Sequence, residues 1–288
     1  MESSLAKKPG FHAPKALDRN ALKYIVIVLM LVDHLVHQIE AVYGYDGTWY
    51  LLGRLISRLT APIMCFFLAE GFRYTRNVKK YTARLGIFAA ISHLPFLFFE
   101  TGQWSPIGIF EGNVGADTVS ALASASFFYL PGVNVTVALY KTSMIFTLFL
   151  GIVTLSLWEK TKWHPAVKGL LTAAVCVVAT FGDWSYWAIL YVLCFYFLRE
   201  KPTAMWSAFI GVSALYIFNI NLSQGPFPLV FEPGFFPYRL GTLLVPLTVL
   251  WFYNGKPGSK ANFHKWFFYV FYPAHLVVLG ILFHYVLA

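Results

Sequence analysis

The stretch Tyr24–Glu40, YIVIVLMLVDHLVHQIE, decides the fold class, because it places ionisable residues inside an apolar run of membrane-spanning length. Its first nine residues carry no charge, and its second half contains Asp33, His34, His37 and Glu40. A charged side chain at the centre of a transmembrane helix costs about 2.5–3.5 kcal/mol on insertion scales. The stretch therefore predicts a membrane helix whose ionisable groups are paired or line a wet cavity, and such groups are functional candidates.

The composition extends this interpretation to the whole chain. Of its 288 residues, 58% are hydrophobic and 12% are charged, whereas soluble domains average about 25% charged residues. Apolar runs recur along the chain, and the alternating pattern of a membrane β-barrel does not stand out. We predict an all-α, polytopic integral membrane protein, a bundle of about nine (possibly ten) transmembrane helices. The expected spans are 24–42, 50–72, 84–100, 142–158, 165–182, 185–198, 203–220, 239–253 and 266–287.

The basic residues predict the orientation of this bundle. Of 22 Lys and Arg residues, 18 alternate onto one face, while Lys141 and Arg239 fall in the opposite loops and Arg54 and Arg58 fall inside the second span. An excess of basic residues marks the cytoplasmic side. We expect a multi-pass protein of the cytoplasmic (inner) membrane with the N-terminus inside and the C-terminus outside. The net charge of +9 is then a topology signal and does not indicate nucleic-acid binding.

This topology divides the chain into a basic cytoplasmic segment, 1–23, and a single transmembrane domain, 24–288. Two outer loops are long. The loop 101–141 is rich in Gly, Ser and Ala, and the loop 221–238 is rich in Pro, Gly and Phe. We expect a short re-entrant or interfacial helix near Ser120–Leu130, and we expect both loops to line an opening on the outer side.

The second span, YLLGRLISRLTAPIMCFFLAEGFRYTRN, supplies counter-charges for the first. Arg54 and Arg58 are four residues apart and share a helix face. Counted from the inner end, Arg58 reaches the depth of Asp33, and Arg54 reaches that of Glu40. Pro62 cannot donate a hydrogen bond to the carbonyl of Arg58, which predicts a kink that opens onto a cavity. The alternative is a purely structural ion-pair cluster that holds the two spans together.

A second cluster, RYTRNVKKYTAR, follows the second span directly. It is either an inner anchor attracted to anionic lipid or a site for a phosphorylated ligand entering from the cytoplasm. Its basic residues are Arg73, Arg76, Lys79, Lys80 and Arg84.

Three isolated residues are weaker candidates. Glu70 lies near the inner end of the second span, where it could pair with Arg73. Asp183 lies in a tight outer turn. His275 follows Pro273 inside the last span and either reaches the cavity or packs as a core histidine. The three cysteines have no metal-ligand spacing, and no zinc, nucleotide-loop or serine-nucleophile motif is present; we expect no metal cofactor.

Several segments of the chain form a recognisable series. In order, they are DH in the first span, GRLISRLTAPIMCFFLAEGFRYTRNVKKYTARL, FTLFLGIVTLSLWEK, FGDWSYWAIL, FYNGKPG and FFYVFYPAHL. In these segments the chain resembles the TraX family. The likeness runs from about Ala21 to Leu282, and the basic segment after LAEGF is its most specific part. The founding activity of this family is N-terminal acetylation of the pilin subunit of a conjugative pilus.

A wider group, the transmembrane acyltransferases, shows related features. Its members carry an arginine, ten intervening residues and then a histidine in the first span. Lys23 and His34 fit that spacing, with lysine in place of arginine. The segment FFLAEGF, Phe66–Phe72, resembles the group's FFxxSGF pattern, with Glu70 where the pattern has Ser.

The resemblance implies transfer of an acyl group from acetyl-CoA to an amine or hydroxyl. The acceptor is expected to be pilin, a peptide, a glycan or a small molecule. His34 would be the general base. Asp33, or a carboxylate reached through His37, would orient it, and Arg58 would stabilise negative charge at the thioester carbonyl.

The remaining candidates have binding or supporting roles in this interpretation. The anionic nucleotide of CoA would rest on basic residues at the inner rim: Arg73, Arg76, Lys79, Lys80, Arg84 and Lys23. Supporting roles fall to Arg54, His37, Glu70, Asp183 and His275.

Two other functions fit the same residues. One is a proton-coupled transporter that uses Asp33, His34 and Arg58 as a relay, although no internal repeat supports it. The other is a non-catalytic membrane subunit of a secretion or conjugation machine. The oligomeric state does not follow from the sequence.

Overall fold

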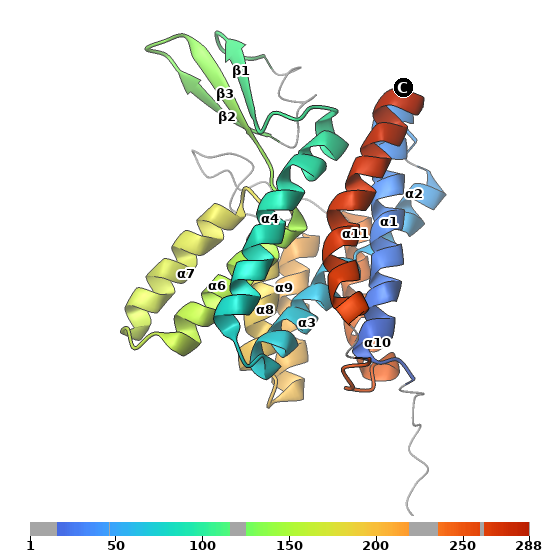
Figure 1. Ribbon diagram of the computed structural model, residues 1–288, viewed down its shortest axis with the longest axis vertical. Helices are drawn as coiled ribbons and strands as arrows, with labels where there is room; N and C mark the ends of the chain where they lie inside the picture. The colour runs from blue at the N-terminus through green and yellow to red at the C-terminus, as the bar shows by residue number, and fades with distance from the viewer. Residues whose placement is uncertain (1–15, 46, 116–124, 219–235, 260–261, 288) are drawn as a thin grey trace, which may run out of the picture.

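Apolar helices run side by side in a bundle, with a small sheet at one end (Figure 1). The computed structural model describes residues 16–45, 47–115, 125–218, 236–259 and 262–287. The opening stretch lies in the first helix, α1 (Arg19–Tyr43). Asp18 begins this helix by accepting a hydrogen bond from the backbone N–H of Ala21 at 2.8 Å, which satisfies a donor that has no partner within the helix.

Within the described residues, each expected span coincides with helical structure. The helices after α1 are α2 (Thr48–Ser57), α3 (Thr60–Tyr74), α4 (Val78–Thr101), α6 (Met144–Lys160), α7 (Pro165–Ala179), α8 (Ser185–Phe197), α9 (Pro202–Ile217), the 3₁₀ helix η1 (Pro237–Leu243), α10 (Leu244–Phe252), α11 (Asn262–Ile281) and the π-helical turn η2 (Leu282–Val286).

Within the described residues, four segments are long and apolar enough to cross a membrane: Arg19–Tyr43, Thr48–Tyr74, Val78–Thr101 and Trp266–Val286. The polytopic helical class is therefore supported. The count of nine spans stays a prediction, because several of the remaining apolar helices are shorter.

The second expected span is interrupted where the proline argument predicted. Helix α2 ends at Ser57 and α3 begins at Thr60, with a turn at Arg58 and Leu59 between them. Pro62 has no backbone N–H for the carbonyl of Arg58, so the helical ladder loses one bond at this point. The break lets α2 and α3 take separate directions.

The long loop 101–141 differs from the prediction. It contains a three-stranded antiparallel sheet of β1 (Ile107–Glu111), β2 (Ala125–Leu130) and β3 (Val135–Tyr140), in the order β1-β3-β2. The all-α expectation is wrong for this loop.

The helix expected near Ser120–Leu130 is also wrong for residues 125–130, which form β2, while 116–124 lie outside the described residues. The alternating burial of β3 is the period of two that a half-buried strand produces. The other long loop, 221–238, lies outside the described residues as far as 235.

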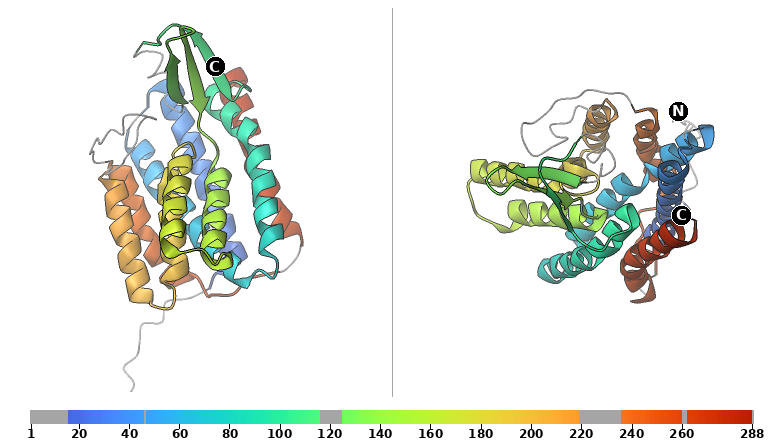
Figure 2. Two further views of the ribbon diagram at one scale, coloured as in Figure 1. Left: turned by 90° about the vertical axis from the view of Figure 1, so that its left-hand side faces the viewer. Right: turned by 90° about the horizontal axis from the view of Figure 1, so that it is seen from above.

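The two ends of the bundle differ in charge. The sheet and the end of α11 lie at one end, and the start of α1 and the α3–α4, α6–α7 and α8–α9 connections lie at the other (Figures 1 and 2). We name the second the basic end, because these parts of the chain carry most of the Lys and Arg residues. Among them are Arg19, Arg73, Lys160 and Arg199. This arrangement agrees with the expectation that most basic residues fall on one face of the bundle. The placement of the basic end in the cytoplasm stays a prediction.

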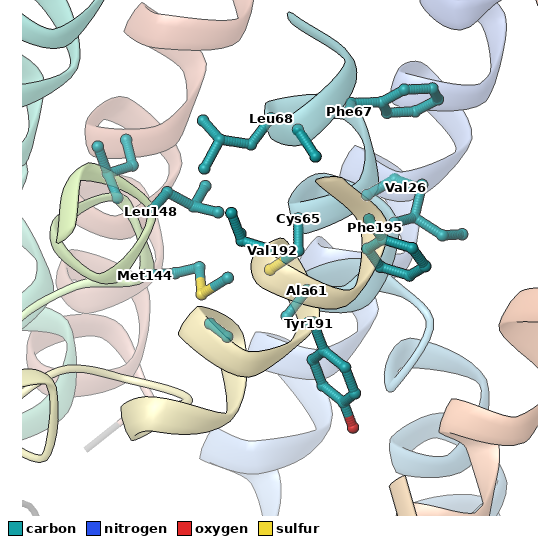
Figure 3. Close-up of a cluster of buried hydrophobic side chains, with 14 of the residues drawn as sticks. Val26, Ala61, Cys65, Phe67, Leu68, Met144, Leu148, Tyr191, Val192 and Phe195 are labelled. Carbon is teal, nitrogen blue, oxygen red and sulfur yellow. The ribbon is translucent and has the colours of Figure 1, made fainter. Parts of the chain in front are cut away.

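The core is built around α3. Figure 3 shows Ala61, Cys65 and Leu68 of α3 among side chains from α6, such as Met144, and from α8, such as Val192. Cys65 is fully buried with a free thiol. It packs as a small apolar residue.

Close approach of η1 to α2 requires a glycine. A Cβ built on Gly241 would overlap the backbone carbonyl of Leu55 and would also meet the Cβ of Arg58 at 3.1 Å. Gly241 therefore lets η1 pack directly on the backbone of α2, beside the residues of the second span that carry charge.

Replacing Gly241 with Ala should lower the melting temperature of the purified protein in detergent, because the added methyl group forces η1 away from α2. Over-packing of this kind costs about 1–3 kcal/mol. The control is Gly211→Ala on α9, where a Cβ meets nothing within 4 Å. This change should be neutral or slightly stabilising, since glycine costs a helix up to about 1 kcal/mol. Equal melting temperatures for the two variants would contradict the close packing.

Candidate functional site

Asp33 and His34 point to different partners because neighbouring residues on a helix diverge by about 100°. Asp33 contacts α2 and the α2–α3 turn, and His34 contacts α11. The ionisable residues of α1 therefore form two clusters. We call them the arginine cluster (Asp33, Arg54, Ser57 and Arg58) and the histidine pair (His34 and His275).

In the arginine cluster, one carboxylate oxygen of Asp33 accepts three hydrogen bonds. Arg54 donates from Nη1 at 2.9 Å, the Ser57 hydroxyl at 2.7 Å, and Arg58 from Nη2 at 2.5 Å. The side chains of Asp33 and Arg58 are only 18% and 8% exposed. The expected pairing of Asp33 with Arg58 is confirmed, while Arg54, expected at the depth of Glu40, also bonds to Asp33. The cluster is largely shielded from water.

Aromatic side chains surround Arg58 on its other sides. Its guanidinium carbon lies 5.1 Å from the ring centroid of Trp184 and 5.5 Å from that of Tyr238, within cation–π range. Trp184 adopts a left-handed backbone conformation, with φ of 64°. This is uncommon for a large side chain, and the Asp183 carboxylate stabilises it by accepting the Trp184 N–H at 2.9 Å. Burial raises the pKa of Asp183 in this turn to about 6.

The histidine pair joins α1 to α11. His34 Nδ1 lies 2.9 Å from His275 Nε2, and the two rings stack with centroids 5.1 Å apart. His275 Nδ1 lies 2.9 Å from the carbonyl oxygen of Phe271 on its own helix. The histidines are 8% and 7% exposed. His275 thus contacts His34, and it is buried there; the sequence left open whether it reaches the cavity or packs as a core histidine.

One turn further from the basic end, α1 contacts the end of α4. His37 Nε2 lies 3.7 Å from a carboxylate oxygen of Glu100 and its Nδ1 lies 4.0 Å from Glu40. Gln38 and His284 both donate to the carbonyl oxygen of Phe99, at 2.8 Å and 3.0 Å. Sequence reasoning missed Glu100, although it is an acidic residue ending the apolar run PFLFFE.

A cavity of about 380 Å³ lies between α1, α3, α4, α6 and α11. Along α1 it is lined by Lys23, Ile27 and Met30, which share one helix face. The same face continues to His34, four residues or about 6 Å beyond Met30. On α11, Phe271 lines the cavity and His275 follows four residues later. Both histidines therefore stand one turn beyond the inner end of the cavity.

The other end of the cavity lies at the basic end. Tyr74 lines it there and is 66% exposed. Along α3 the lining runs from Tyr74 to Thr60, about 21 Å at 1.5 Å per residue. The polar lining residues are Arg19, Lys23, Thr60, Tyr74, Thr75, Tyr81, Arg84, Tyr269 and Tyr272. The cavity is thus long, apolar in its middle and basic at its mouth.

The structure separates the predicted nucleotide-binding residues into three groups. Lys23 and Arg84 line the cavity, and Arg84 donates to the Tyr269 hydroxyl at 3.1 Å. Arg73 instead pairs with Glu200 at 3.0 Å in an exposed ion pair. The remaining three are exposed near the start of α4 and do not line the cavity: Arg76, Lys79 and Lys80.

Glu70 has a different partner from the one expected. It accepts from Arg19 Nε at 3.0 Å and from the Tyr253 hydroxyl at 2.9 Å, so the expected partner Arg73 is replaced by Arg19. Backbone bonds hold this arrangement, since Leu17 donates to Phe252 and accepts from Asn254, both at 2.9 Å. Sequence reasoning missed Arg19 as a cavity residue, although it lies on the same helix face as Lys23, one turn earlier.

Comparison with known proteins identifies the family. The family model described as TraX protein matches residues 18–114 and 117–283. The chain belongs to the TraX family. A curated relative, the probable fimbrial assembly protein FimC, serogroup H1, of Dichelobacter nodosus, is 30% identical over 264 residues, which cover 90% of this chain and 92% of the relative. No solved structure matches the chain.

The matched TraX regions contain α1, α3, α4, α6 and α11, which surround the cavity, and they include both members of the histidine pair. Across the part of the chain that the structure describes, no three His, Cys, Asp or Glu side chains gather as a metal site would require.

Replacing Arg58 with Ala should destabilise the protein by about 3 kcal/mol, near the lower end of the cost of breaking a buried ion pair, because Arg54 still pairs with Asp33. The measurement is denaturant or thermal unfolding in detergent. The matched control is Arg73→Ala, which breaks an exposed pair with Glu200 and should cost at most about 1 kcal/mol. Equal losses in the two variants would show that the arginine cluster is not a stabilising contact.

Proposed function

We propose that this TraX-family protein is an integral membrane acetyltransferase that moves an acetyl group from acetyl-CoA to an amine or hydroxyl acceptor. The observation that carries the proposal is the cavity, because it leads from a basic mouth along one face of α1 to within one turn of His34. The remaining support comes from the family and from the chemistry of the lining.

The shape and lining of the cavity suit the thioester arm of CoA. The anionic nucleotide cannot enter an apolar interior and would stay at the mouth, where Lys23 and Arg84 supply positive charge. The narrow pantetheine arm would extend inward. Its amide groups need hydrogen-bond partners, and the Thr60 hydroxyl, which lines the cavity, has no partner among the described residues. Cytoplasmic placement of the mouth would give access to the donor.

His34 would act as the general base. A neutral imidazole accepts a proton from the attacking N–H or O–H while the acceptor's lone pair bonds to the thioester carbonyl carbon. The tetrahedral intermediate then collapses with cleavage of the C–S bond. The departing thiolate takes the proton back from the imidazolium, so the products are the acetylated acceptor and free CoA thiol. The thioester must pass Met30 and Phe271 to reach the base.

The acceptor would approach from the sheet end of the bundle. The relative is named as a fimbrial assembly protein, and the TraX family is linked to pilin. We therefore propose a pilin or fimbrial subunit as the first acceptor to test. His37, Glu40 and Glu100 lie on this side of His34 and would meet the acceptor first.

The proposal changes the expected role of the arginine cluster. Arg58 is bonded to Asp33 on the face of α1 that contacts α2, while His34 contacts α11. Arg58 would therefore hold α1 in place. Its stabilisation of the thioester carbonyl stays a prediction, as does the orientation of His34 by Asp33. The transporter alternative predicts pH-dependent flux without binding of acetyl-CoA.

Replacing both Lys23 and Arg84 with Gln should weaken binding of acetyl-CoA, and the loss should grow at low salt, because screening is then least. The measurement is the Kd of acetyl-CoA for the purified protein in detergent, at two ionic strengths. Arg73→Gln is the matched control, since it also removes basic charge at this end but lies outside the cavity lining. Equal affinities for the double variant and the wild type would show that acetyl-CoA does not bind at the mouth of the cavity.

Replacing His34 with Ala should reduce acetyl transfer by about 10²–10⁴-fold, the usual contribution of a general base. Binding of acetyl-CoA should persist, because His34 lies beyond the lining of the cavity. The assay follows CoA thiol release with a peptide bearing a free N-terminal amine, and the same peptide acetylated beforehand is the control. A His34→Ala protein with near-normal turnover would reject the mechanism.

A further inference from the structure

The hydrogen bonds of the histidine pair determine which ring nitrogens carry protons. His275 Nδ1 lies 2.9 Å from the Phe271 carbonyl oxygen, which can only accept a hydrogen bond. Nδ1 of His275 must therefore carry the proton. In a neutral imidazole the other nitrogen then has only a lone pair, so His275 Nε2 is an acceptor.

The same reasoning extends to His34. Its Nδ1 lies 2.9 Å from His275 Nε2. Because Nε2 of His275 accepts, Nδ1 of His34 must donate, and a neutral His34 then has its lone pair on Nε2. The opposite assignment would place an unprotonated His275 Nδ1 against a carbonyl oxygen. A single arrangement thus satisfies both hydrogen bonds with both rings neutral.

We propose that His275 is a positioning residue that holds His34 in the tautomer whose Nε2 is free to accept a proton. This inference rests on the proposed acetyl transfer. It assigns His275 a role through His34, without contact between His275 and the substrate. The sequence assigned His275 only an unspecified supporting role, and this partner of His34 lies 241 residues further along the chain.

Packing around His275 fixes the ring that makes these contacts. The Phe271 ring stacks on it with centroids 5.0 Å apart and an angle of 8° between planes, and the Tyr272 ring packs edge-on at 5.5 Å. Both aromatic residues also line the cavity. The same two side chains therefore close the end of the cavity and orient the ring that orients His34.

The contact between His34 and His275 would also stabilise the charged form of His34 that arises during the reaction. When His34 Nε2 takes a proton from the acceptor, the ring becomes an imidazolium, and its Nδ1–H becomes a stronger donor. His275 Nε2 already accepts that bond, so no reorganisation is needed as the charge develops. His34 keeps its place until the proton passes to the departing thiolate.

The test compares two replacements of His275 in the full-length protein. His275→Phe keeps the size and stacking of the ring but removes the acceptor. His275→Gln can place its amide oxygen near the position of Nε2. With acetyl-CoA and the free-amine peptide, we expect the Phe variant to lose tenfold or more in kcat with an unchanged KM for acetyl-CoA. The Gln variant should recover most of that loss.

The matched control is His284→Phe, since His284 lies nine residues further along the chain and bonds to the Phe99 carbonyl without contact to His34. It should leave kcat unchanged. A His275→Phe protein with wild-type kcat would overturn the inference. So would equal losses in the Phe and Gln variants, which would indicate packing alone.

A second measurement separates this inference from the proposed function. Nitrogen-15 NMR of labelled histidines reports the tautomer directly. His34 Nε2 should be unprotonated in the wild type and in the Gln variant, and largely protonated in the Phe variant. Absence of thiol release from the wild type would reject the acetyltransferase alone. A protonated His34 Nε2 in the neutral wild-type protein would reject the inference, whatever the activity.

Discussion

One carboxylate in an apolar helix sets the arrangement of the whole site. Asp33 accepts hydrogen bonds from Arg54, Ser57 and Arg58, and these bonds fix the rotation of α1 about its own axis. With Asp33 turned to α2, His34 must face α11. The face that carries Lys23, Ile27 and Met30 then borders the cavity. Pairing with the two arginines offsets the cost of burying the Asp33 carboxylate. The same pairing determines the directions in which the other side chains of α1 point.

The cavity and the histidine pair lie along the same two helices but do not meet. Met30 and Phe271 line the inner end, and each is followed four residues later by a histidine. In the proposed acetyl transfer, this separation would allow binding and chemistry to be altered independently. Changes at the mouth would act on affinity for acetyl-CoA, whereas changes at the histidines would act on proton transfer. The cavity and the histidine pair both depend on α11, which contributes Phe271 and Tyr272 to the cavity and His275 to the pair.

Features that depend on local pattern were predictable from the sequence. The helical membrane class follows from apolar runs, and the break before Thr60 follows from Pro62. The pairing of Asp33 with Arg58 follows from their depth in neighbouring spans, whereas depth alone placed Arg54 beside Glu40 and not beside Asp33. Contacts between distant segments were not predictable. Nothing in the sequence near Glu70 indicates that Arg19 is its partner rather than Arg73, and the helix order alone does not place His275 against His34. The sheet in the loop 101–141 had a local signal in the alternation of Val135–Tyr140, which the small residues around it obscured.

The backbone pairing of Leu17 with Phe252 and Asn254 has a consequence for synthesis. Leu17 and helix α1 leave the ribosome long before Phe252 and Asn254, the backbone partners of Leu17, are synthesised. Arg19 and Lys23 line the cavity from this early part of the chain, and Phe271 and Tyr272 line it from the last helix. An incomplete chain therefore lacks the part of the cavity lining that α11 contributes. The proposed donor site can be complete only after the carboxyl-terminal helices have been synthesised.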